Sequence, residues 1–216
     1  MKKQLFFIII YIFIYTSSFS QTNNITDIKN AKQYTFDGFK IGDNFGKMMD
    51  KYPYNQFCDQ DPIDNKTRRF MCYAPVEHGG RAFPDQTTVV LYLKYAQDNF
   101  NTHIEYKQPI EAFAYLYGYY FNNKTDFSLK PSDDLNLAKK QFGEEIKTFD
   151  ITSPENPYDE DSQEYTLKVY QFNGDIYIIA DEDKIIGFVL GEMPSDPYNE
   201  QWLALMQMYS RYTPKD

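Results

Sequence analysis

Residues 165–190 read YTLKVYQFNGDIYIIADEDKIIGFVL and carry the clearest structural signal in the chain. Runs rich in β-branched and aromatic residues predict three strands, at 165–172, 175–180 and 185–190. Asn173-Gly174 lies between the first two runs and is the strongest short hairpin signal, while residues 181–184 supply the second turn. The stretch therefore predicts an antiparallel β-meander.

Helical spacing is clearest near the two ends of the chain. Apolar positions i, i+3, i+4 and i+7 predict one helix whose stripe is Phe45, Met48, Met49 and Tyr52. Asp43 is expected as its N-cap, and Pro53 is expected to stop it. The last helix is expected to begin at Asp196-Pro197 and to bury Trp202, Leu205, Met206 and Tyr209.

The middle of the chain is predicted to be helical as well. Apolar residues fall nearly all round a helix over 109–121, which predicts that this helix is buried. A further helix has Ser132 as its cap, and Gly143 suits the position just after its end. Additional strands are expected at 69–73, 87–96, 103–107 and 146–151.

Helices and strands segregate along the chain, which predicts an α+β fold with short helices packed on antiparallel β-meander sheets. Residues 1–20 are expected to be a signal peptide, and 21–35 an extended lead-in. Residues 36–107 would form a first α+β half with the disulfide, and 108–216 a second half with the C-terminal helix. The halves are compatible with two degenerate helix-plus-sheet repeats, although no strong residue-level self-similarity is visible. The sequence leaves open whether they form one domain or two.

The N-terminus has the pattern of an export signal. Two lysines precede an apolar run from Leu5 to Tyr15, and small residues follow at Ser18 and Ser20. The run is shorter than the roughly 20 apolar residues of a spanning helix, although an uncleaved anchor is the alternative. We expect cleavage after Ser20 and a periplasmic or secreted protein without a membrane anchor.

Export changes the expected chemistry of the two cysteines. In an oxidising compartment Cys58 and Cys72 most simply pair with each other. The bridge would close a loop of about 15 residues, which is worth roughly 3 kcal/mol in the chain-entropy treatment. The alternative is a free catalytic thiol beside His78.

Composition limits the remaining function classes. The chain has 22 Lys and Arg against 31 Asp and Glu, so its formal net charge is −9. It lacks the clustered positive charge that nucleic acid binding requires. The two histidines do not have the spacing of zinc ligands, so the sequence does not predict a zinc site. We expect no metal, no cofactor and no catalytic residues. A secreted hydrolase that uses dispersed acids with His78 or His103 is an alternative, because such sites leave no local motif.

Residues 39–52 (FKIGDNFGKMMDKY) resemble the helix start, iG-x-x-x-x-x-v-x-x-x-x-G, of the SmpA/BamE and beta-lactamase-inhibitor-like repeat group. Members of that group are small exported α+β units with a helix or helix pair before an antiparallel sheet. Residues 109–191 have the same expected order. The resemblance implies a non-catalytic protein-binding module. The chain departs from the group by lacking a lipid-anchor cysteine and by having Tyr52-Pro53 in place of the glycine after the helix.

Residues 153–164 (SPENPYDEDSQE) contain five acids and no basic residue. Because complementary charge steers association, Asp159, Glu160 and Asp161 are expected to contact a partner protein with a basic surface. A solvated loop is the alternative. The function favoured is an exported, non-enzymatic protein-binding module, such as an inhibitor or immunity-type protein. A component of cell-envelope assembly or structure is the third interpretation.

Overall fold

Eight strands and four short helices form within the residues that the structure, a computed structural model, describes, namely 30–36, 38–51, 57–58, 69–75, 88–94, 108–116, 126, 128–152 and 166–212. The strands are β1 (Phe57–Cys58), β2 (Arg69–Pro75), β3 (Thr88–Lys94), β4 (Ile110–Leu116), β5 (Lys147–Thr152), β6 (Thr166–Phe172), β7 (Ile176–Asp181) and β8 (Lys184–Leu190). The helices are the 3-10 turn η1 (Ala31–Gln33) and the α-helices α2 (Phe45–Lys51), α3 (Leu135–Phe142) and α4 (Glu200–Tyr212).

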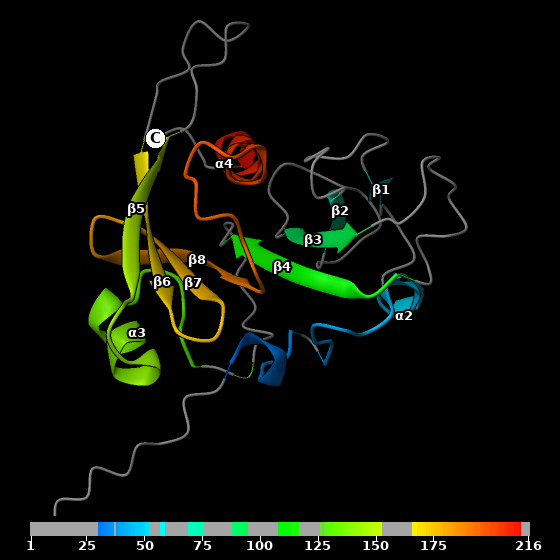
Figure 1. The fold of residues 1–216 in the computed structure, drawn as a ribbon, viewed down its shortest axis with the longest axis horizontal. Coiled ribbons are helices and arrows are strands. Elements are labelled where there is room, and N and C mark those ends of the chain that lie inside the picture. The colour runs from blue at the N-terminus through cyan, green and yellow to red at the C-terminus, as the bar shows by residue number, and fades with distance from the viewer. Residues whose placement is uncertain are drawn as a thin grey trace, which may run out of the picture.

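All eight strands belong to one antiparallel sheet, in the order β1-β2-β3-β4-β8-β7-β6-β5. Two four-stranded meanders therefore meet where β4 pairs with β8 (Figure 1). This confirms the α+β class with short helices on antiparallel sheet. It also confirms the strands predicted at 69–73, 87–96 and 146–151 and the meander over 165–190, whereas the strand predicted at 103–107 lies outside the described residues.

The helix predicted over 109–121 is wrong, because residues 110–116 form strand β4. This strand lies between β3 and β8, and its two faces enter different cores. Phe113 and Tyr115 pack on one side of the sheet, and Ala112 and Ala114 on the other. A strand buried on both faces is apolar at nearly every position, as β4 is except at Glu111, so it has a composition similar to that of a buried helix.

The expected helix caps are each displaced along the chain. Asn44, and not Asp43, accepts a hydrogen bond from the start of α2, at Gly46 N (2.8 Å). Asp134, and not Ser132, is the N-cap of α3. Helix α4 begins at Glu200 and not at Asp196-Pro197, because Asn199 Oδ1 accepts from Gln201 N (2.9 Å). Several cap-forming residues lie within a few positions of each other at each site, and sequence alone does not choose between them.

Helices cover both faces of the sheet (Figure 1). One face packs against η1, α2 and α3, through Ala31, Tyr34, Phe36, Phe45, Met48, Leu135, Ala138 and Phe142. The other packs against α4, through Trp202, Leu205 and Met206. Strands β7 and β8 are buried on both sides as a result.

Residues 30–36 cross the first of these faces. Residues up to 35 were expected to be an extended lead-in, but residues 31–33 form η1. Ala31 N donates to Gly174 O (2.6 Å) at the β6–β7 turn. Phe36 packs against Tyr115, with ring centroids 5.1 Å apart. The segment therefore joins the turn of the second meander to the central strand of the sheet.

Candidate functional site

The acidic segment predicted to bind a partner is the connection between β5 and β6. Strand β5 ends at Thr152 and β6 begins at Thr166, and these two residues are directly paired. Their hydroxyl oxygens lie 3.0 Å apart, within hydrogen-bond distance. Residues 153–165, with Asp159, Glu160 and Asp161, lie outside the described residues, so the structure shows the base of the candidate site and not its tip.

Strand β5 of this hairpin is fastened to the loop before α4, starting at the end of the strand that is farthest from the acidic connection. Lys147 Nζ donates to Ser195 O (2.7 Å) and lies 5.2 Å from the centroid of the Phe149 ring. Phe149 meets Trp202 edge-on, with centroids 5.5 Å apart. A cation near an aromatic face and an edge-to-face aromatic pair are both favourable arrangements. Strand β5, although it is an edge strand, is therefore held against α4.

Trp202 and Tyr177 hold the loop that precedes α4. Trp202 is fully buried, and its Nε1 donates to Pro194 O (2.8 Å). The Tyr177 hydroxyl accepts from Met193 N and donates to Met193 O, both at 3.3 Å. The Trp202 and Tyr177 rings lie 5.6 Å apart. Sequence analysis placed Trp202 on the buried stripe of a helix, but no local signal linked it to Tyr177 or to β5.

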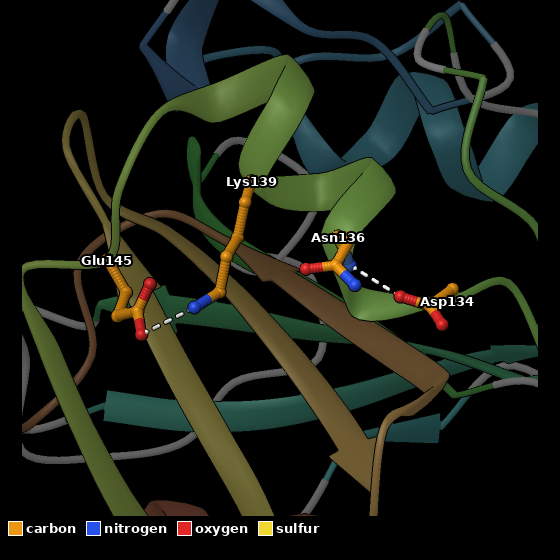
Figure 2. A network of polar contacts seen from close by, with 4 residues as sticks. All are labelled: Asp134, Asn136, Lys139 and Glu145. Atoms are coloured by element: carbon orange, nitrogen blue, oxygen red, sulfur yellow. Dashed lines mark hydrogen bonds and ion pairs between the residues drawn. The ribbon is translucent and has the colours of Figure 1, made fainter.

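A second polar network lies at α3, on the opposite face of the sheet (Figure 2). Asp134 Oδ1 accepts from Asn136 N (2.9 Å) at the start of the helix. Lys139 Nζ lies 2.9 Å from Glu145 Oε1. This hydrogen bond raises the pKa of Lys139 and is the largest cause lowering the pKa of Glu145. Glu145 Oε2 has no hydrogen-bond partner within the described part of the chain.

The two cysteines come from adjacent strands. Cys58 of β1 is the direct cross-strand partner of Cys72 of β2. Opposed residues of an antiparallel pair have Cα atoms about 4.5–5.5 Å apart, within the range that a disulfide spans. Cys72 is completely buried in the first core. The register is thus compatible with the predicted bridge, and the bridge itself stays a prediction.

The residues of the alternative hydrolase site, His78 and His103, lie outside the described residues. Within the described ranges, no group of three or more His, Cys, Asp and Glu residues is placed to hold a metal ion. Nor does any helix in those ranges have the length and apolarity needed to cross a membrane.

Comparison of the chain with protein-family models, with curated protein sequences and with solved structures found no match.

Proposed function

We propose that the protein is an exported, non-enzymatic module that binds another protein, in the manner of an inhibitor or immunity protein. The export signal at residues 1–20 and the resemblance to exported protein-binding repeats support this proposal. So does the excess of acidic over basic residues, 31 against 22. Cleavage after Ser20 would remove two lysines and no acid, and would leave the mature chain still more acidic.

The observation that carries the proposal is that the acidic β5–β6 connection is attached to a hairpin which is itself held in place. Five acids within residues 153–164 are joined to a hairpin whose base pairs at Thr152 and Thr166. Lys147 and Phe149 fasten the same hairpin to the α4 region. Recognition residues are commonly carried on loops that a rigid scaffold positions. An acidic loop on such a base suits a partner with a basic surface.

The test first isolates the partner and then changes the loop charge. The tagged protein is purified from its native periplasm or medium, and a stoichiometric partner is identified. Asp159→Asn, Glu160→Gln and Asp161→Asn, combined in one chain, are then compared with the wild type for association rate. We expect slower association at low salt and a smaller difference at high salt, because salt screens exposed charges over about 10 Å at 0.1 M.

A matched control makes the same charge change elsewhere. Asp181, Glu182 and Asp183 are exposed at the β7–β8 turn, and their replacement by Asn, Gln and Asn also removes three negative charges. This control should slow association much less than the loop variant. Equal rates for wild type and loop variant at low salt would contradict a role of the loop in recognition.

A further inference from the structure

We infer that the chain is built from two copies of one folding unit, related by an approximate two-fold axis through the β4–β8 pair. The first unit comprises α2 with β1 to β4, and the second comprises α3 with β5 to β8. Three features support this inference: the segment before each helix, a bulge in each meander and the pairing between the units. The inference does not depend on the proposed function.

The segments before the two helices fold alike, and we call residues 40–45 and 130–135 the latch segments. In the first, Lys40 N donates to Asp43 Oδ2 (2.9 Å), and Asp43 N donates to Lys40 O (3.0 Å). In the second, Lys130 and Asp133 make the same two bonds at 2.7 and 3.2 Å. The side chain of the next residue, Asn44 or Asp134, then accepts from the backbone N–H two positions further on.

Each latch segment is bonded to the fourth strand of its own meander in the same pattern. In the first unit the bonds are Gly42 N to Ile110 O (2.8 Å), Ile110 N to Asp43 O (2.9 Å) and Phe45 N to Gln108 O (2.9 Å). In the second unit they are Ser132 N to Ile185 O (2.9 Å), Ile185 N to Asp133 O (2.9 Å) and Leu135 N to Asp183 O (3.0 Å). Gly42 and Ser132 both have positive φ, at 92° and 63°. The latch segments are thus offset by 90 residues (Gly42 to Ser132), and the strands by 75 (Ile110 to Ile185).

The bulges confirm the strand offset independently of the latch segments. Between β3 and β4 the register passes from Leu93–Ile110 to Tyr92–Ala112, so Glu111 is the extra residue. Between β7 and β8 it passes from Ala180–Ile185 to Ile179–Gly187, so Ile186 is the extra residue. Glu111 and Ile186 are also 75 residues apart. A bulge re-aims a strand, so one shared position gives both fourth strands the same bend.

The pairing between the units has the symmetry that such a duplication requires. The pairs across β4 and β8 are Phe113–Leu190, Ala114–Val189, Tyr115–Phe188 and Leu116–Gly187. The 75-residue offset matches Ala114 with Val189, which are already partners, so the axis passes between them. Rotation about it exchanges the pair Phe113–Leu190 with the pair Phe188–Tyr115, and both pairs exist. It relates the pair Leu116–Gly187 to Gly191 and Ala112, which are in close contact but are not a register pair. The contact between units is therefore isologous, as in a two-fold dimer.

The shared backbone pattern requires only a few side chains to be identical in the two units. The residue type is the same in both units at Lys40 and Lys130, Asp43 and Asp133, Ile110 and Ile185, and Phe113 and Phe188. The aspartate supplies the oxygen that satisfies the turn, and Ile and Phe fill the core beside the axis. Most of the other equivalent positions need only the right burial, which explains why sequence comparison of the halves shows little.

Paired substitutions in the full chain test the equivalence by native-state hydrogen exchange. Asp43→Ala should speed amide exchange at Gly42, Phe45 and Ile110 about tenfold, because a charged acceptor is lost from the turn. Asp133→Ala should have a similar effect at Ser132, Leu135 and Ile185. Each variant should leave the other unit much less affected. Asp43→Asn and Asp133→Asn keep an acceptor oxygen and serve as controls with smaller, matched effects.

The two variants are compared directly to decide the outcome. Local changes of similar size at the two equivalent sets of amides support the duplication. A local change in one unit without its counterpart in the other would overturn it. If an alanine variant does not fold, a chain carrying KPSDDL at positions 40–45 gives the second test. It should retain one cooperative unfolding transition, whereas the same six residues in shuffled order should not, and equal behaviour of the two chains would contradict the inference.

Discussion

Ser132 carries backbone strain that its equivalent in the first unit avoids. Its φ is 63°, in the left-handed region, whereas glycine occupies the matching position at Gly42. Removing the Cβ should relieve this strain, so Ser132→Gly is expected to raise the free energy of unfolding by about 0.5–1 kcal/mol. Gly42→Ala should lower it by a similar amount, because nothing lies within 4 Å of a Cβ there and only the backbone is strained. Urea unfolding measures both, and shifts of the same sign would contradict the argument.

The Lys139–Glu145 pair makes a contribution to stability that depends on pH. The pKa of Glu145 is lowered in the folded chain, chiefly by the hydrogen bond from Lys139. Its contribution is therefore present above the ordinary pKa of glutamate and is lost as the pH falls through the lowered value. We expect Glu145→Gln to lower the unfolding midpoint slightly at pH 7 and not at all near pH 2. Glu144→Gln, beside it and exposed, should change the midpoint less at pH 7. A difference between wild type and Glu145→Gln that persists unchanged in acid would refute this assignment.

At the scale of elements, the predicted disulfide between β1 and β2 can be tested through its effect on stability. Cys58 and Cys72 are cross-strand partners, and β1 contains only two residues. Replacing both by Ser should lower the free energy of unfolding by roughly 3 kcal/mol, since the unfolded chain would lose its cross-link. Denaturant unfolding of the wild type with and without reductant provides the control and should show a similar loss. Two titratable thiols in the unfolded, non-reduced protein would rule out the bridge.

The strands that were predicted correctly in the second meander, β6 to β8, are short runs bounded by local turn signals. The β6–β7 hairpin was predicted because Asn173-Gly174 marks the turn between two runs rich in β-branched and aromatic residues, and Gly174 does adopt positive φ there. Strand β4 was missed because its apolar run continues to Phe121 and is therefore long enough for a helix. Its burial comes from α4 and β8, which are distant in sequence, so no local pattern distinguishes it from a buried helix.

In the candidate site, too, some features could be predicted from the sequence and others could not. The acidic run 153–164 and the strands on either side of it were visible as composition and alternation. The contacts that fasten strand β5 were not, because Lys147 bonds to the backbone of Ser195 and Phe149 packs on Trp202. Contacts over such separations depend on how the elements are arranged in space, and no local sequence pattern indicates that arrangement.

At the scale of the whole molecule, each core draws on both meanders. The first core contains Cys72 of β2 together with Phe172 of β6. The second contains Ala114 of β4 together with Val169 of β6. Neither meander can separate from the other without exposing apolar surface on both faces of the sheet. The two units are therefore expected to unfold together, although each has its own latch segment bonded to its fourth strand.

This expectation can be tested with the single tryptophan of the chain, Trp202. Its fluorescence reports the packing of α4, and far-ultraviolet circular dichroism reports the sheet, so the two urea transitions should coincide. Leu205→Ala removes a fully buried side chain of α4 and should shift both transitions together, by about 2–5 kcal/mol. Leu137→Ala is the matched control, because Leu137 is 46% exposed on α3 and its loss should cost about 0.5 kcal/mol or less. A fluorescence change that precedes the circular dichroism change would mean that α4 detaches from a sheet that stays folded. The second core would then be an independent layer, and the cooperative coupling of the two units would rest on the β4–β8 pair and the first core alone.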